Sequence, residues 1–355
     1  MTIEEFHKEI NELMPFREVK DSKGRTMSFK LRVKTALDRY SNIAKQFVAD
    51  DTLNDIFDIS KRLLDIINQY EKGLQASAYN KLQLLIQGKR GMPPKIDLTR
   101  TVLPFDEGKP IIFYRIRLMD SIYGVEPKEL FHIPINKRGM VKTQRYSTPG
   151  YPCLYLGKSI YGCWEEMCRP SMQRCAVSRL EYSGDLKIVD LSRPMKAFLN
   201  IPELQKLIPL IISCMIPVAN KDATYKPEYI IPQLIMQWVL KSRDRGIDGV
   251  CYTSTHINDE FYFPEDKFMN YAIPVYKVNE RYNYCPKLCE HFKITSPTTN
   301  DIEKLKHGYA IDGGGAGART EDERRKQNYL CSDFSHLEKR LEDTGVFPLQ
   351  TISPK

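Results

Sequence analysis

The sequence predicts an α+β protein, with a helical N-terminal part and a later part that mixes strands and helices. Over the first ~95 residues, apolar side chains recur at the 3.6-residue spacing of helices. From about residue 110, short β-branched and aromatic runs such as Ile111–Arg117 indicate strands, with helical stretches between some of them. Strands that need not alternate strictly with helices are typical of the α+β class.

Length and composition are those of a folded chain. The 355 residues correspond to about two domains of ~150 residues each. Hydrophobic residues make up 42% of the chain and charged residues 28%, which excludes wholesale disorder. The 53 Lys and Arg against 45 Asp and Glu give a net charge of +8. This mild excess suits an anionic small molecule and does not single out nucleic acid as a partner.

Three features predict a cytoplasmic chain without membrane contact. The longest apolar run, Leu207–Val218, contains two prolines and is shorter than the ~20 residues of a spanning helix, so it predicts a buried helix or strand. The N-terminus lacks the basic region and apolar stretch of a signal peptide. The nine cysteines are odd in number and irregularly spaced, which favours reduced thiols.

Capping patterns place the N-terminal helices. Thr2 with Glu5 forms a capping box before a first helix, and Thr52 with Asp55 predicts the start of a longer one that ends before Gly73. A helix lies between them, and a fourth ends at Gly88. The breaking segment 89–94 then predicts a domain boundary. The expected domains are residues 1–95, residues 105–280 and a C-terminal extension, 281–355, that packs on the second domain.

Later elements follow from short apolar runs. Strands are expected over residues 111–117, 153–156, 176–182, 186–191, 249–254 and 271–278, and helices over 160–168, 201–215 and 228–243. Ser159 is a natural N-cap for the first of these helices. The remaining C-terminal residues are weakly patterned, with a flexible glycine-rich loop near 312–320 and a short helix near 335–341.

Two tempting motifs lack the context that their chemistry needs. Gly313–Gly317 is followed by no Gly-Lys-Ser/Thr and preceded by no clear strand, so it predicts a linker and not a phosphate loop. Cys285, Cys289 and His291 resemble part of a metal site, but no second ligand pair has matching spacing. A loop with incidental cysteines, and no metal, is the prediction.

One segment gathers polar and aromatic residues around a single strand. Between Gln144 and Ser159, a Pro-Gly turn leads into the strand Cys153–Leu156, and the helix that begins near Ser159 carries Glu165 and Glu166. Composition alone is also compatible with an ordinary strand–helix unit whose charges lie at the surface.

This segment resembles the RES domain, a family named for its Arg, Glu and Ser. The matching elements, in family order, are Phe113-Tyr114-Arg115-Ile116, Arg145-Tyr146-Ser147, Pro149-Gly150, Leu154-Tyr155-Leu156, Ser159 to Glu166, and Ser254 after Gly246-Ile247-Asp248-Gly249. The resemblance covers about residues 111–278.

The chain departs from the family pattern at two places. The family triplet often has Trp-Asn where this chain has Tyr146-Ser147. Two adjacent glutamates compete for the glutamate position, and the spacing from Ser159 favours Glu166 over Glu165. Which of the two carries the family role stays open at this point.

The resemblance implies a split β-sheet fold similar to that of ADP-ribosyltransferases. It implies an enzyme that cleaves the nicotinamide–ribose bond of NAD, with water or phosphate as the acceptor, so that NAD is a substrate and neither a metal nor a true cofactor is needed. Many family members are toxins held in check by a separate Xre-like antitoxin. The N-terminal helices resemble an extension of longer members, and could serve as inhibitor, sensor or oligomerisation surface.

The resemblance also implies roles for particular residues. The catalytic set is Arg115, Glu166 and Ser254, and the NAD-binding set is Arg145, Tyr146, Ser147, Tyr155, Arg117 and Glu165. Glu166 would hold the ribose hydroxyls, and its charge would stabilise an oxocarbenium-like ribose. The guanidinium groups of Arg115 and Arg145 would bind the pyrophosphate.

The other roles concern the two ends of the dinucleotide and the strand beside Arg115. Tyr155 or Tyr146 would stack on nicotinamide, and Ser254 would hydrogen-bond to the ribose or the nicotinamide amide. Arg117 lies two residues from Arg115 and therefore on the same face of its strand.

Two alternative functions keep the same pocket. In the first, ADP-ribose is transferred to a protein or a nucleic acid. In the second, the pocket senses NAD without cleaving it. The presence of Arg115, Glu166 and Ser254 together argues against a sensor, which needs no such set.

Overall fold

The computed structural model describes residues 1–89, 91–105, 108–119, 124–171, 174–242, 246–257, 263–276, 283–298 and 320–349. It divides into two compact units, each built from separated parts of the sequence. Unit 1 comprises residues 1–103, 143–147 and 187–255, and unit 2 comprises residues 104–142, 148–186 and 256–355. The chain thus first leaves unit 1 near the predicted boundary, but it returns twice. The division at 95–105 remains a prediction about domains.

Unit 1 is a helical assembly with a parallel pair of strands. Its helices are α1 (Ile3–Leu13), α2 (Phe29–Ala44), α3 (Asp50–Glu71), α4 (Gln75–Gln87), α6 (Pro202–Cys214) and α7 (Ile230–Lys241), and its strands are β4 (Ile188–Leu191) and β5 (Gly249–Thr253). The strands β4 and β5 pair in parallel, with Ile188 opposite Gly249. Parallel neighbours require a crossover connection, which α6 and α7 supply here.

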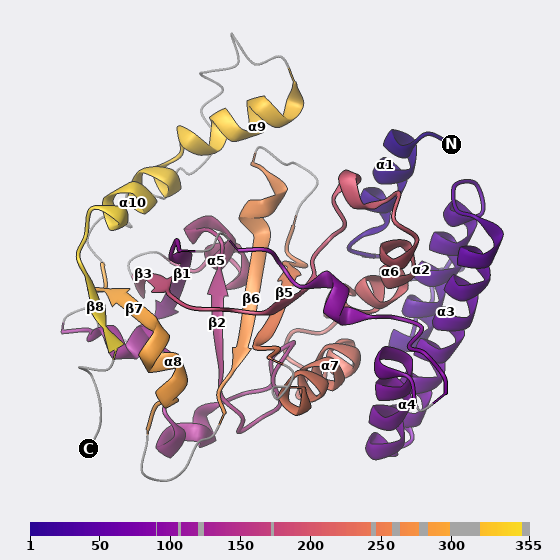
Figure 1. Ribbon diagram of the computed structural model, residues 1–355, viewed down its shortest axis with the longest axis horizontal. Coiled ribbons are helices and arrows are strands. Elements are labelled where there is room, and N and C mark those ends of the chain that lie inside the picture. The colour runs from indigo at the N-terminus through magenta and orange to yellow at the C-terminus, as the bar shows by residue number, and fades with distance from the viewer. Residues whose placement is uncertain are drawn as a thin grey trace. The chain divides into compact units, whose positions relative to one another are not determined.

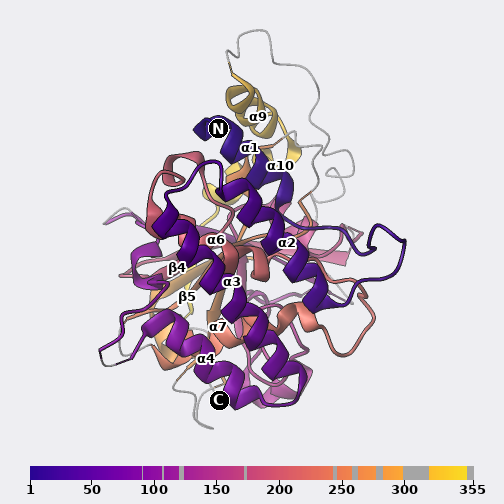
Figure 2. The same cartoon turned by 90° about the vertical axis from the view of Figure 1, so that its right-hand side faces the viewer.

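The core of unit 1 lies around α6 and α7. These two helices contact the N-terminal helices α2, α3 and α4, and α7 also contacts β5. Figures 1 and 2 show α2, α3 and α4 side by side within this unit. All eight residues of α6 from Leu207 to Cys214 are buried, so this part of the helix has no solvent-exposed face. These eight residues are the first part of the apolar run predicted to be buried, and the run continues beyond the end of α6.

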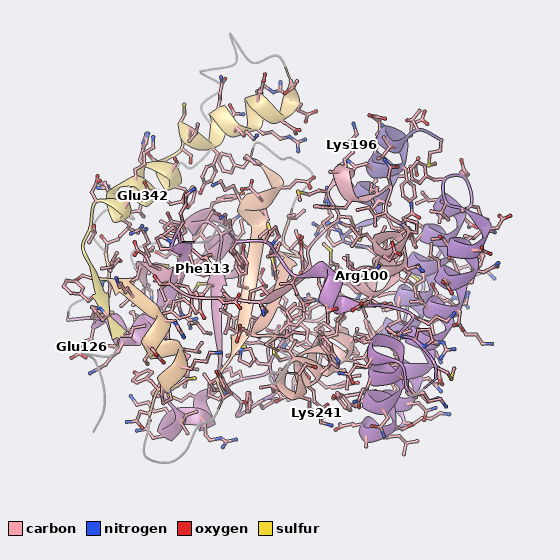
Figure 3. All side chains as sticks on the ribbon, in the orientation of Figure 1. Arg100, Phe113, Glu126, Lys196, Lys241 and Glu342 are labelled. Carbon is pink, nitrogen blue, oxygen red and sulfur yellow. The ribbon has the colours of Figure 1, made fainter. Side chains whose placement is uncertain are left out.

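Unit 2 is built on an antiparallel sheet. Its strands lie in the order β6-β2-β1-β3-β7-β8, and every neighbouring pair is antiparallel. Their bounds are β1 (Ile111–Leu118), β2 (Cys153–Gly157), β3 (Cys175–Tyr182), β6 (Met269–Pro274), β7 (Phe292–Thr295) and β8 (Val346–Pro348). Phe113, fully buried in β1 and labelled in Figure 3, packs edge-on against Tyr271 of β6.

Four α-helices lie in the part of unit 2 that the structure describes. They are α5 (Ile160–Glu166), α8 (Pro286–His291), α9 (Glu321–Leu330) and α10 (Asp333–Glu342). Residues of α5, α9 and α10 share one hydrophobic cluster with Tyr114 and Ile116 of β1. The predicted α+β class is confirmed, because helices and a largely antiparallel set of strands make up the two units.

Local signals placed several elements correctly. The capping box of Thr2 and Glu5 is present at the start of α1. Gly73 directly follows Lys72, the C-cap residue of α3. Its φ is 80°, a conformation that glycine adopts without a steric penalty. Ser159 is the N-cap of α5, as predicted.

Other expectations were wrong. Thr52 does not start α3, which begins at Asp50 with Ala49 as its N-cap. Asp50 and Asp51 lie in the first turn instead, where the positive end of the helix dipole stabilises their carboxylates. Residues 286–291 form α8 and not a loop, with Cys285 buried as the N-cap residue. The glycines at 313–317 lie outside the described residues.

The C-terminal part is more regular than its weak patterning predicts. The short helix expected near 335–341 lies within α10. The strands β7 and β8 are four and three residues long, too short to show an alternation. Helix α9 is mostly charged, but Thr320 and Glu323 form a capping box at its start. That pattern was the available signal for this helix.

In the described part of the chain, none of the helices is both long and apolar enough to cross a membrane. All nine cysteines lie in this part, and none forms a disulfide.

Candidate active site

Arg115 is a poorly hydrated cation in β1 of unit 2. Its Nη1 donates a hydrogen bond to the carbonyl oxygen of Tyr155 at 2.6 Å, whereas its Nε–H is buried without an acceptor. Among the described residues, no carboxylate forms an ion pair with it. Burial, with a smaller contribution from the nearby Arg117 charge, lowers the pKa of Arg115 to about 10. A desolvated guanidinium with unused donors is suited to an anionic ligand.

Arg117 extends the positive charge along the same face of β1. It lies two residues after Arg115, is half-buried and donates from Nη1 to the backbone oxygen of Glu129. The charge of each arginine therefore acts on the other, which raises the cost of keeping both charged without a nearby anion.

A tight connection between β2 and α5 places the two glutamates. A Cβ atom on Gly157 would lie 2.4 Å from the Sγ of Cys163 and 3.0 Å from the Ser159 carbonyl oxygen, so a larger residue there would displace the buried Cys163 side chain. Ser159 then caps α5: its Oγ accepts from the Gly162 backbone N–H at 2.9 Å and donates to the Lys267 carbonyl at 2.6 Å. The strand end and the helix start are thus held in one fixed geometry.

Glu165 and Glu166 have different surroundings although they are adjacent on α5. Glu165 is buried and pairs with Arg169, whose Nε lies 2.9–3.0 Å and Nη2 2.7 Å from its carboxylate. Arg169 has a φ of 54°, so this pair also ties down the strained turn after α5. Glu166 is half-buried and accepts a hydrogen bond from the side-chain amide of Asn270 at 3.2 Å. This difference favours Glu166 as the ligand-facing carboxylate.

Asn270 is a site residue that the sequence reasoning missed. It is 4% exposed and lies on β6 directly opposite Gly157 of β2. A buried asparagine must have hydrogen-bond partners, and Glu166 is one of them. The available signal was a lone polar side chain in the otherwise apolar strand Met269–Pro274.

The buried Cys163 thiol connects α5 to β1 beside Arg115. Its Sγ donates a hydrogen bond to the carbonyl oxygen of Tyr114, the residue before Arg115, at 3.3 Å. Glu166 lies three residues after Cys163 on α5, so Arg115 and Glu166 belong to neighbouring elements of unit 2. Burial raises the pKa of Cys163 to about 12; among nearby charges Arg115 lowers it, and Glu338 and, less strongly, Glu166 raise it.

His132 lies close to Arg115 and is unsuited to act as a base. It is fully buried; its Nε2 accepts from the Cys285 backbone N–H at 2.9 Å, so that Nδ1 carries the proton and donates to the Ile133 oxygen at 2.8 Å. Burial, with a smaller contribution from Arg115, lowers its pKa to about 4. Both ring nitrogens are thus used in holding the fold.

Four other predicted site residues lie in unit 1 and are buried there: Arg145, Tyr146 and Ser147 of the NAD-binding set, and Ser254 of the catalytic set. The ring centroid of Tyr146 lies 4.7 Å from that of Tyr252. Burial, with a smaller effect of the Cys214 thiol, raises the pKa of Tyr146 well above its usual value. The carbonyl oxygen of Ser147 accepts from Gln233 at 3.1 Å. Ser254 directly follows β5 and is fully buried. Their roles toward NAD remain predictions.

Arg145 closes the C-terminal end of α6. Its Nη1 donates to the carbonyl oxygens of Cys214 at 2.8 Å and Ile216 at 3.1 Å, and its Nη2 donates to the Thr255 Oγ1 at 3.1 Å. Carbonyls at the end of a helix have no partners within the helix. Arg145 therefore satisfies buried acceptors of unit 1, a structural task that sequence spacing could not reveal.

Replacing Arg145 by methionine is expected to destabilise the protein by about 2–4 kcal/mol, because buried carbonyl groups lose a charged donor. The measurement is urea unfolding followed by circular dichroism. Arg100→Met is the matched control: Arg100, labelled in Figure 3, is exposed in unit 1, and its ion pairs at 3.5–3.6 Å should contribute less than ~1 kcal/mol. Equal midpoints for the two variants would contradict the structural role.

No group of three or more His, Cys, Asp or Glu side chains within the described ranges is arranged to hold a metal ion. The absence of a metal in the reaction remains a prediction.

Comparison with known proteins gives a family and one named relative. Residues 113–277 match the model of the RES domain. The chain is 35% identical over 206 residues to "Putative toxin YopC" of Bacillus subtilis (strain 168); the aligned part is 53% of this chain and 46% of that protein. The chain thus spans about half the length of that relative. No solved structure matches this chain.

The matched segment begins in β1 and ends just after β6, so it contains Arg115, α5 and Asn270. The resemblance drawn from the arginine, glutamate and serine motifs is therefore confirmed, because residues 113–277 of this chain match the RES domain model.

Proposed function

We propose that this chain is a toxin of the RES family that degrades NAD by cleaving its nicotinamide–ribose bond. The observation that carries the proposal is the presence, within unit 2, of a half-buried guanidinium that forms no ion pair with a described carboxylate, together with a carboxylate held by Asn270. Arg115 offers unused donors to an anion, and Glu166 is oriented by Asn270. NAD supplies both matching parts, a pyrophosphate and a ribose that becomes cationic during cleavage.

The proposed reaction needs little from the protein beyond charge and orientation. The bond between the ribose C1 and the nicotinamide nitrogen breaks, and its electron pair stays on nicotinamide, which leaves as a neutral molecule. The ribose then carries an oxocarbenium-like charge, which the Glu166 carboxylate stabilises. Water adds to C1 and loses a proton to give ADP-ribose. Inorganic phosphate as acceptor gives ADP-ribose phosphorylated at the same carbon.

Arg115 would bind the pyrophosphate and so fix the ribose beside Glu166. Guanidinium groups can bond two phosphate oxygens at once, and such bonds are stronger in a desolvated site. Tyr155, in contact with Arg115 through its carbonyl, is placed on the strand that leads to α5. Its predicted role is to stack on nicotinamide.

The test is incubation of the purified chain with NAD, with and without inorganic phosphate, followed by separation of the products. Release of nicotinamide that is absent with Glu166→Ala supports the proposal, and the second product distinguishes water from phosphate. Intact NAD after prolonged incubation with folded protein contradicts it. Label from NAD retained on a macromolecule would instead establish ADP-ribosyl transfer.

The toxin part of the proposal rests on the RES domain and on the printed name of the Bacillus subtilis relative. It predicts that production of the chain in bacteria stops growth and lowers cellular NAD, and that a separate antitoxin restores growth. Growth arrest that persists with Glu166→Ala would separate toxicity from NAD loss.

A further inference from the structure

A C-terminal carboxylate outside the matched RES segment reaches the start of the helix that carries Glu166. Glu338 of α10 is 7% exposed, and its Oε1 accepts a hydrogen bond from the Ile160 backbone N–H at 2.8 Å. The same oxygen accepts from the Tyr329 hydroxyl at 2.6 Å. Ile160 is the first residue of α5, where backbone N–H groups have no partner within the helix.

The apolar faces of the C-terminal helices continue this contact. Phe334, Leu337 and Leu341 of α10 are buried in one cluster with Ile160 and Cys163 of α5. The ring of Phe334 lies 5.1 Å from that of Tyr161 and 5.6 Å from that of Trp164. A seven-residue helix is marginal on its own, so its position depends on such packing.

Lys267 lies near both Glu338 and the start of α5. The Lys267 ammonium lies 4.4 Å from the Tyr329 ring centroid, and its charge favours the ionised form of Glu338. The Lys267 carbonyl accepts from Ser159, the N-cap of the same helix. Burial opposes ionisation and raises the pKa of Glu338. A buried carboxylate is costly, and here two donors compensate it, the Ile160 N–H at the start of α5 and the Tyr329 hydroxyl of α9.

We propose that Glu338 is a positioning residue for α5, and that the C-terminal helices α9 and α10 are an essential part of the active unit. Glu338 fixes one end of α5, while Glu166 at the other end meets Asn270. The effect on catalysis rests on the proposed function of Glu166; the effect on the helix does not. The RES segment at 113–277 is then incomplete without residues 320–342.

The expected result for Glu338→Ala is a fall in kcat for nicotinamide release of roughly 10- to 100-fold, because small displacements of a catalytic group have effects of that size. KM should change by less than about threefold, since Glu338 has no described contact with Arg115. Glu338→Gln should recover most of kcat, because its amide oxygen can still accept both hydrogen bonds. Tyr329→Phe is a milder variant that leaves the Ile160 bond in place.

Hydrogen exchange supplies a readout that does not depend on activity. The Ile160 amide should exchange at least 10-fold faster in Glu338→Ala than in wild type, at a temperature where both are folded. Glu342→Ala is the matched control, since Glu342 is on the same helix, exposed, and labelled in Figure 3.

Unchanged Ile160 exchange in Glu338→Ala overturns the proposal, as does a Glu338→Gln variant as impaired as Glu338→Ala. Wild-type protein that leaves NAD intact contradicts the proposed function alone. The exchange measurement then still decides whether Glu338 holds α5.

Discussion

Glu166→Gln is expected to reduce kcat for nicotinamide release by at least ~100-fold, with the protein still folded. The substitution keeps the size of the side chain and a hydrogen-bond acceptor for Asn270, but it removes the negative charge. A charge aimed at the group that becomes cationic in the transition state contributes on this scale. The measurement is steady-state release of nicotinamide, with thermal unfolding as the check on folding.

Glu165→Gln is the matched control for this prediction, because the two residues are adjacent on α5. Glu165 is committed to Arg169 at 2.7 Å, so its neutralisation should lower thermal stability and leave kcat within about threefold of wild type. If Glu165→Gln abolished activity in folded protein and Glu166→Gln did not, NAD cleavage would stand and the assignment of the two glutamates would be reversed.

Arg115→Met is expected to raise KM for NAD by roughly 10- to 100-fold, the loss that follows from removing hydrogen bonds to a charged group. The same change should leave the free energy of unfolding unchanged or increase it. In the free protein Arg115 is a desolvated cation, and none of the described carboxylates compensates it, so the fold bears a cost that methionine removes.

Comparison with Arg145→Met separates an effect on ligand binding from an effect on stability. Arg145 satisfies buried carbonyls and should be needed for stability, whereas Arg115 should be needed for the ligand and not for stability. The pair is measured by NAD titration and urea unfolding on the same samples. Unchanged KM with reduced stability in Arg115→Met would assign Arg115 a structural task and contradict its role in binding.

Much of the RES domain could be predicted from local sequence. The β-branched and aromatic run at 111–117 is β1, and Ser159 caps the helix that follows β2. These elements depend on propensities and caps within a few residues, which periodicity and spacing report directly. The order of the arginine, glutamate and serine motifs then pointed to the family that the comparison confirmed.

Spacing from Ser159 favours Glu166 over Glu165, but it gives no physical reason for the choice. Neighbouring residues on a helix point about 100° apart, and the sequence does not say which of the two directions faces the site. The partner that distinguishes Glu166 is Asn270, which lies 104 positions away in the chain. The partner that distinguishes Glu165 lies only four positions away, but it acquires its position through the strained turn after α5.

The sequence by itself determined the α+β class, the main strands and helices, and the RES motifs, because these are written in short-range patterns. Tertiary structure decided which charged side chains satisfy buried backbone groups and which are left for a ligand. Arg145 caps a helix 69 residues further along the chain, and Glu338 reaches Ile160 across 178 residues. The cost of a buried charge depends on the donors and acceptors that folding brings to it, and contacts across such separations leave no periodic trace in the sequence.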